Sequence, residues 1–251
     1  MKNTDKPILC KSLDLLSGWL PIDKKALFDA YDQQKTGCRY RIETIRHHTY
    51  CIFTFPILNQ EGEEVTTELF QKNGSFPMYL LIQLVFDENN EIIADTALYY
   101  LQADQINNPV ILDYLEEESD WLYWESYILL NMFDDFSYRD LILIYSNAYT
   151  SMENRNHNIF HQMIQNIESF MSVKDMTVYS VISLDPDVAC YGKDKTDKPY
   201  FYSMKDEPQR LYNAKLLENM GFHPIKLETD EPVEDGSLLW FAWKKASYIY
   251  L

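Results

Sequence analysis

Residues 141–184 read LILIYSNAYTSMENRNHNIFHQMIQNIESFMSVKDMTVYSVISL, and they carry the strongest secondary-structure signals of the chain. Its first five residues form a continuous apolar run, as in a central strand that is buried on both faces. A short polar loop over residues 150–154 follows, and apolar side chains then recur at helical spacing from Ile159 to Met171. Residues 176–184 form a second apolar run. The stretch therefore predicts a strand, a helix and a second buried strand.

The sequence on the C-terminal side predicts one more helix and two more strands. Pro208 suits the first turn of a helix that runs to about Met220, and Gly221 is well placed as its C-cap. Residues 222–227 and 238–244 have the composition of two closing strands.

The sequence on the N-terminal side predicts a helix followed mainly by strands. Residues 22–31 have the apolar spacing of an amphipathic helix, and residues 40–58 favour one long or bent strand. Residues 79–86 and 92–101 predict a β-hairpin, with Asn89-Asn90 in its turn because asparagine tolerates a positive φ. Together these elements predict an α/β (α+β) fold with a mixed, mostly antiparallel central sheet flanked by helices.

Composition excludes several classes of protein. The chain has 251 residues, 46% of them hydrophobic, which predicts a globular protein with a sizeable core. Its net charge of −17 repels phosphate backbones, so we expect no nucleic-acid partner. The sequence contains no run of about 18 apolar residues, so no membrane span is predicted. The four cysteines show no paired spacing, which favours reduced thiols and a cytoplasmic location.

The positions of the glycine and acidic residues limit the kinds of binding site that the chain can contain. There is no glycine from Ser75 to Tyr191, so neither a standard dinucleotide fingerprint nor a P-loop fits there. Acidic residues cluster in two places, residues 113–120 and 228–235. They fit either solvated loops and helix faces or the mouth of a site that attracts a cation.

The stretch Leu211–Phe222, LYNAKLLENMGF, carries a family resemblance. Its tail is similar to the second conserved helix of the GNAT superfamily of N-acetyltransferases, which ends in Gly-Phe before a strand. With the order of elements over residues 78–245, the chain resembles a degenerate member of that superfamily. The resemblance implies a single GNAT-like domain over residues 1–251, divergent over residues 1–77, and acetyl-CoA or another acyl-CoA as donor.

The main motif of that superfamily is Arg/Gln-x-x-Gly-x-Gly/Ala between a strand and a helix, where helix N–H groups bind the pyrophosphate of CoA. The matching stretch here begins at Arg155, which fits the motif. Asn158 replaces the first glycine, and asparagine can adopt unusual backbone angles. Phe160 replaces a small residue and would block the phosphates unless it points into the core. The resemblance implies these cofactor-binding residues: Tyr149, Thr150, Arg155, Asn156, His157 and Asn158.

The catalytic residues are less directly implied. In many superfamily members, a tyrosine on the helix that ends in Gly-Phe acts as general acid. Leu217 stands at that position in this chain. Tyr212 on the same helix and Tyr145 on the preceding strand are the candidate acids. Glu125 is the only acidic residue centred in the apolar residues 121–130, which fit either a strand or a helix. If Glu125 is buried, its pKa rises toward the range of a general base; the alternative is a solvent-facing strand residue.

No metal site is expected. His157 and His161 have the spacing of the zinc motif H-E-x-x-H, but Asn158 stands in place of its glutamate, so we expect helix-surface histidines. His47-His48 lies in an expected strand, where the two side chains would point to opposite faces.

The sequence favours an acyl-CoA-dependent N-acyltransferase that transfers an acetyl group to a primary amine or lysine. The acidic charge favours a cationic amine or lysine-bearing acceptor. The alternative is a catalytically inactive GNAT-like protein that binds a partner through exposed aromatic residues in residues 121–127. An acidic mimic of nucleic acid is a third hypothesis, and it requires a regular spacing of carboxylates across one face.

Overall fold

The computed structural model has two compact units, and the chain passes from one unit to the other three times. Unit 1 comprises residues 1–101 and 148–171, and unit 2 comprises residues 102–147 and 172–251. The structure describes residues 5–19, 24–33, 38–56, 78–106, 109–118, 120–133, 136–137, 140–154, 158–171, 176–184, 207–227 and 239–248. The expectation of one domain over residues 1–251 stays a prediction.

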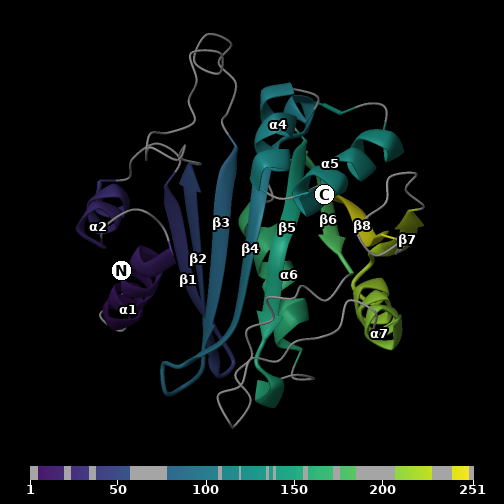
Figure 1. Ribbon diagram of the computed structural model, residues 1–251. Helices are drawn as coiled ribbons and strands as arrows, with labels where there is room; N and C mark the ends of the chain where they lie inside the picture. The colour runs from purple at the N-terminus through teal and green to yellow at the C-terminus, as the bar shows by residue number, and fades with distance from the viewer. Residues whose placement is uncertain are drawn as a thin grey trace. The chain divides into compact units, whose positions relative to one another are not determined.

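Unit 1 is an antiparallel sheet with helices on both faces. Its strands follow the order β1-β2-β3-β4, each paired antiparallel with the next (Figure 1). The elements of this unit are α1 (Asp5–Trp19), α2 (Lys24–Asp32), β1 (Arg39–Ile45), β2 (His48–Pro56), β3 (Tyr79–Phe86), β4 (Ile92–Gln102), the short helix η2 (Met152–Asn154) and α6 (Ile159–Met171).

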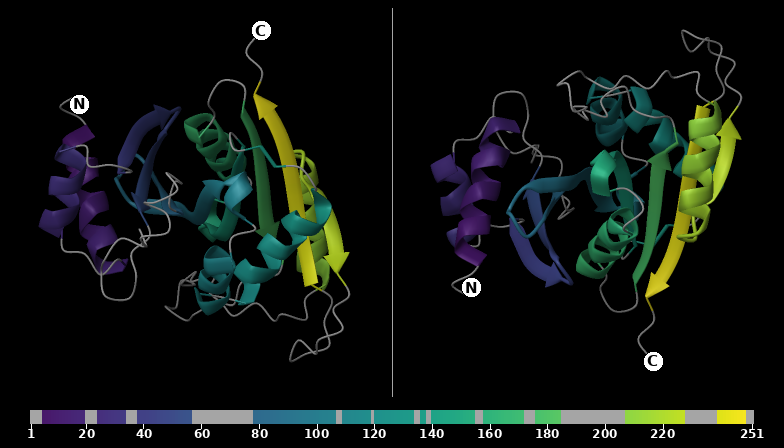
Figure 2. Two further views of the ribbon diagram at one scale, coloured as in Figure 1. Left: turned by 90° about the horizontal axis from the view of Figure 1, so that it is seen from above. Right: turned by 90° about the horizontal axis from the view of Figure 1, so that it is seen from below.

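Alternation along β3 explains why both faces of unit 1 are covered. Leu84 and Phe86 point to one face, where they pack against Leu13 of α1. Val85 points to the other face, where it packs against Met163 of α6. Figure 2 shows α1 and α2 on one side of these strands and α6 on the other. The helices predicted over residues 22–31 and 159–171 are confirmed.

The expectation of a single strand over residues 40–58 is wrong. The chain turns at Arg46-His47, and Ile45 pairs with His48, so the segment is a hairpin. Arg46 adopts a φ of 56°, which permits the tight turn. The expectation that His47 and His48 share a strand is also wrong, because His47 lies in the turn with its Nδ1 2.7 Å from Oε1 of Glu88.

The hairpin predicted over residues 79–101 is confirmed. β3 and β4 pair antiparallel, and Asn90 adopts a φ of 61° in the turn between them. The carboxylate of Asp87 accepts hydrogen bonds from the backbone N–H groups of Asn89 (2.9 Å) and Glu91 (2.8 Å). The turn is thus held by its own side chain, as expected of Asx turns.

Unit 2 holds the parallel strand pair. Its strands follow the order β5-β6-β8-β7, with β5 and β6 parallel and the other pairs antiparallel. Its elements are the short helix η1 (Ala103–Gln105), α4 (Pro109–Glu118), α5 (Asp120–Met132), β5 (Leu141–Thr150, whose last three residues belong to unit 1), β6 (Met176–Ser183), α7 (Glu207–Glu218), β7 (His223–Leu227) and β8 (Leu239–Tyr248).

Helix α7 ends as its sequence predicts. Gly221 adopts a φ of 85°, its N–H bonds to the carbonyl of Glu218 (3.0 Å), and the N–H of Phe222 bonds to the carbonyl of Leu217 (3.0 Å). These bonds satisfy carbonyl groups that the end of a helix otherwise leaves unpaired. α7 then contacts β7 and β8 within unit 2.

The predicted fold class, a mixed and mostly antiparallel sheet structure flanked by helices, is confirmed. The elements from β3 to β8 follow the order on which the GNAT resemblance rests: a hairpin, then strand, helix, strand, helix and two strands. The two additional helices α4 and α5 lie between β4 and β5. Within the described ranges, no helix combines the length and apolar character needed to cross a membrane.

Candidate active site

The candidate site lies at the end of the parallel strand pair in unit 2. The pairing of β5 with β6 runs from Leu141 and Val178 to Tyr145 and Ile182. Beyond Ile182, β6 adds only Ser183, whereas β5 continues to Thr150. In open sheets with parallel strands, ligands bind outside the carboxyl ends of the strands. A ligand is therefore expected to bind near the carboxyl end of β6.

Glu125 reaches this strand end from α5. Its side chain is buried, with 1% of the residue exposed, and it takes a hydrogen bond from the backbone of Ser183. Its Oε2 atom has no hydrogen-bond partner. Burial raises the pKa of Glu125 well above its ordinary value, and the bond from Ser183 opposes that rise only in part. Burial of an acid favours its neutral form, so this carboxyl holds its proton to a higher pH than an exposed glutamate does.

The fold explains why a carboxyl group is buried here. One turn after Glu125, Ile128 packs against Phe241 of β8. Phe241 is the cross-strand neighbour of Ser183, which bonds Glu125. The apolar contact and the hydrogen bond are thus adjacent, and together they fix α5 on the sheet. The prediction of a buried Glu125 is confirmed, and residues 121–130 are helical, so its alternative as a solvent-facing strand residue is wrong.

Tyr145 lies at the same strand end but on the other face. It is 1% exposed, and its Cα neighbour in β6 is Ile182. Directly paired residues point to one face, and successive residues of a strand alternate. Because Ser183 shares its face with Phe241, which packs on α5, Tyr145 points away from α5. The sheet therefore separates Tyr145 from Glu125.

Tyr212 belongs to α7, and its side chain lies outside what the structure describes. The next residue, Asn213, donates a hydrogen bond from Nδ2 to the carbonyl of Leu184 (3.3 Å). α7 is thereby tied to the residue that follows β6. No sequence signal singles out Ser183 or Asn213, because the role of each depends on which strand end it meets in the folded chain.

The predicted cofactor residues belong to unit 1. Tyr149 and Thr150 are half-buried at the end of β5. Asn158 is exposed before α6 with a φ of 65°, and its carbonyl accepts the N–H of Gln162 (3.0 Å). The prediction that Asn158 supports an unusual backbone angle is confirmed. Arg155, Asn156 and His157 lie outside the described residues, so their roles stay predictions.

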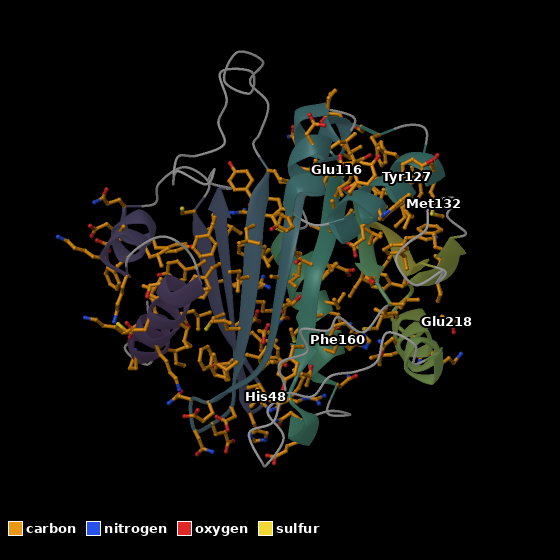
Figure 3. All side chains as sticks on the ribbon, viewed as in Figure 1. His48, Glu116, Tyr127, Met132, Phe160 and Glu218 are labelled. Atoms are coloured by element: carbon orange, nitrogen blue, oxygen red, sulfur yellow. The ribbon has the colours of Figure 1, made fainter. Side chains whose placement is uncertain are left out.

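Phe160 is half-buried in the first turn of α6 (Figure 3). Its neighbour Ile159 is fully covered and packs against the sheet with Met163. Phe160 is therefore partly withdrawn from solvent, although it is less covered than the core-facing residues of α6.

The nine predicted site residues thus divide between the units. Glu125, Tyr145 and Tyr212 belong to unit 2, and the other six belong to unit 1. Within unit 2, Glu125 and Tyr145 are brought to one end of the β5–β6 pair. Across the described ranges, no three His, Cys, Asp or Glu side chains come together in a way that could hold a metal ion. His161 is half-buried on α6.

No protein-family model and no curated protein matches the chain. Similar solved structures include N-acetyltransferases. NAA60 of Arabidopsis thaliana, in complex with a bisubstrate analogue, is 12% identical with a TM-score of 0.37, covering 78% of this chain and 97% of that one. Nourseothricin acetyltransferase is 12% identical with a TM-score of 0.33, covering 84% of this chain and 99% of that one. At these identities and TM-scores, the two structures do not establish an activity for this chain.

Proposed function

We propose that the protein is an acyl-CoA-dependent N-acyltransferase that moves an acetyl group to a primary amine or lysine-bearing acceptor. The observation that carries the proposal is Glu125, a buried carboxyl with one unpartnered oxygen at the end of the parallel strands. A carboxyl without a full set of partners is costly to bury. Such groups gather where a proton has to be moved.

The chemistry of amine acylation gives this carboxyl a task. An amine arrives as an ammonium ion and must lose a proton before its nitrogen can attack a thioester. The ionised form of Glu125, which is populated as pH rises through its raised pKa, takes that proton as general base. The new C–N bond then forms, the C–S bond breaks, and the departing thiolate needs a proton. Tyr212 on α7 is the proposed acid, because Tyr145 lies on the other face of the sheet from Glu125. The nitrogen releases its second proton as the amide forms, and that proton restores the neutral tyrosine.

The donor would be held through unit 1. The first turn of a helix leaves backbone N–H groups without intrahelical partners, so the start of α6 is a suitable place for a pyrophosphate. Asn158 fits this role because it already has the positive φ that glycine provides in the superfamily motif. Arg155, Asn156 and His157 would add donors and positive charge, and Tyr149 and Thr150 would line the end of β5. The thioester of the acyl-CoA supplies the activated acyl group.

Two measurements test the proposal. Thiol release from acetyl-CoA is followed with a panel of polyamines, aminoglycosides and lysine peptides. We expect turnover with a cationic amine, its loss in Glu125→Gln, and its retention in Glu153→Gln, which changes an exposed carboxylate of unit 1. No turnover with acetyl-CoA or longer acyl-CoAs across the panel would overturn the proposal.

Donor binding is tested by thermal unfolding. Ligand at about 100 times its dissociation constant stabilises a protein by roughly 2.7 kcal/mol. We expect this shift with acetyl-CoA, and we expect Asn158→Asp to abolish it because a carboxylate would repel the phosphates. Asn89→Asp adds the same charge at an exposed turn of unit 1 and is expected to keep the shift. If both variants keep it, the donor binds elsewhere.

One observation favours a second function, that of a catalytically inactive GNAT-like binding protein. Two large apolar side chains, Tyr127 and Met132, are exposed on α5. A protein that binds acetyl-CoA without turnover on any amine would fit this alternative. A cytoplasmic location is also proposed, since the four cysteines of the sequence show no paired spacing.

A further inference from the structure

The helices α4 and α5 form a surface with an unusual composition, called here the acidic hairpin and defined as residues 103–138. It contains nine Asp or Glu residues and no Lys, Arg or His. Asp113 and Glu116 are exposed on α4, which packs against α5. In a segment of this length, basic residues normally intersperse with acidic ones. Glu125 is one of the nine and is buried, whereas Asp104, Asp113 and Glu116 are exposed, so the charge described on the surface of this segment is negative.

The outer face of α5 adds apolar surface to this charge. Tyr127 is 44% exposed and Met132 is 38% exposed, and they are two of the three large hydrophobic residues exposed among the described ones. Figure 3 shows both on α5, with Glu116 on α4. Single exposed apolar residues are ordinary, but tyrosine and methionine next to uniform charge have the composition of a contact surface.

Tyr127 is held in place rather than free. Its ring meets Trp124 edge to face at 5.6 Å between centroids, and Trp124 meets Tyr123 in the same way at 5.8 Å. Trp124 in turn packs against the cluster of Ile128 and Phe241, which anchors α5 on the sheet. A ring fixed in this way loses little conformational freedom when a partner binds.

We propose that the acidic hairpin docks a basic, lysine- or arginine-rich segment of a partner protein. Charge complementarity selects this occupant. A second copy would bring the same acidic surface against itself in a two-fold dimer, and like charges oppose that contact. An anionic membrane surface and nucleic acid are repelled for the same reason. A cationic segment gains from the carboxylates, and its Lys or Arg groups can lie over the face of Tyr127 while their stems cover Met132.

This surface does not depend on acyl transfer, so its test is a binding measurement. The probe is a fluorescein-labelled 14-residue peptide of lysine, alanine and glycine, followed by fluorescence anisotropy at about 150 mM salt. A matched peptide with glutamate in place of lysine is the charge control. We expect the full-length protein to bind the lysine peptide and not the glutamate peptide.

Matched variants separate a docking surface from general attraction to a protein of net charge −17. Asp113→Lys with Glu116→Lys is expected to weaken binding about tenfold. Asp32→Lys with Glu153→Lys changes the net charge equally at exposed positions of unit 1 and is expected to weaken it much less. Tyr127→Ala is expected to weaken binding about fivefold through the lost ring contact.

The proposal is overturned if the two charge-reversed variants weaken binding equally, because the attraction would then belong to the whole chain. It is also overturned if Tyr127→Ala binds as the wild type does. Circular dichroism of each variant shows whether α5 is intact, and Tyr127→Phe keeps the ring and is expected to bind like the wild type.

Discussion

The variant Glu125→Gln is expected to become more stable than the wild type as pH rises. The same substitution removes the proposed base. In the folded chain the carboxyl is buried and takes one hydrogen bond from Ser183, and burial raises its pKa above its ordinary value of 4.5. The unfolded chain releases this proton near 4.5, whereas the folded chain keeps it. Between those two pKa values the unfolded state binds fewer protons, so the free energy of unfolding falls as pH increases.

The magnitude follows from the linkage relation. Across the interval between the two pKa values, the wild type loses up to about 1.4 kcal/mol of stability for each unit of pH. Glutamine does not titrate, keeps an oxygen for the bond from Ser183, and retains the shape of the neutral acid. The difference in unfolding free energy between Glu125→Gln and wild type is therefore small below about pH 4.5 and increases by up to about 1.4 kcal/mol per pH unit above it.

Urea denaturation from about pH 4.5 to about pH 8, followed by tryptophan fluorescence, measures this difference. Glu153→Gln is the control, since it removes an exposed carboxylate and is expected to give no such increase. A difference for Glu125→Gln that stays constant over this range, or declines as pH rises, would show that the buried carboxyl is ionised and would refute the reasoning.

Three further predictions concern single side chains. Gln83 of β3 is fully buried and neither amide atom has a hydrogen-bond partner, so Gln83→Met is expected to stabilise the protein by about 1–3 kcal/mol; a fall in melting temperature would contradict this. Gly221→Ala is expected to destabilise the protein by about 1 kcal/mol because Gly221 has a φ of 85°. Gly18 lies in a helix with open space around it, so Gly18→Ala is expected to stabilise the protein by about 0.5–1 kcal/mol. Chemical denaturation of both variants distinguishes backbone strain from side-chain crowding. Tyr212→Phe is expected to reduce kcat about 10²-fold with little change in KM, and unchanged turnover would assign the acid to another residue.

The elements of residues 141–227 could be predicted from sequence because each carries a strong local signal. A continuous apolar run indicated β5, a run rich in β-branched and apolar residues indicated β6, and Gly221 marked the end of α7. The stretch over residues 40–58 failed because both halves are rich in β-forming residues and the turn consists of Arg46 and His47, which are not typical turn residues. Helix α1 was not expected, although Leu9, Leu13 and Leu16 recur at helical spacing and are buried against the sheet.

The site was predictable only in part. Glu125 could be selected because a lone carboxyl amid apolar residues signals burial. Its partner Ser183 could not, because that contact depends on which strand end α5 meets in the folded chain. Whether residues 121–130 form a helix was equally undecided, since an evenly apolar segment lacks the periodicity that separates helix from strand.

The alternation of the chain between its two units sets an order of events during synthesis. Strands β1 to β4 are complete once residue 102 has been made, yet the helix that covers one of their faces ends at Met171. The face of the sheet that contains Val85 therefore stays uncovered while the first segment of unit 2 is translated. A ribosome-bound chain of this length is expected to engage a chaperone at that face, and no single cut in the gene yields either unit whole.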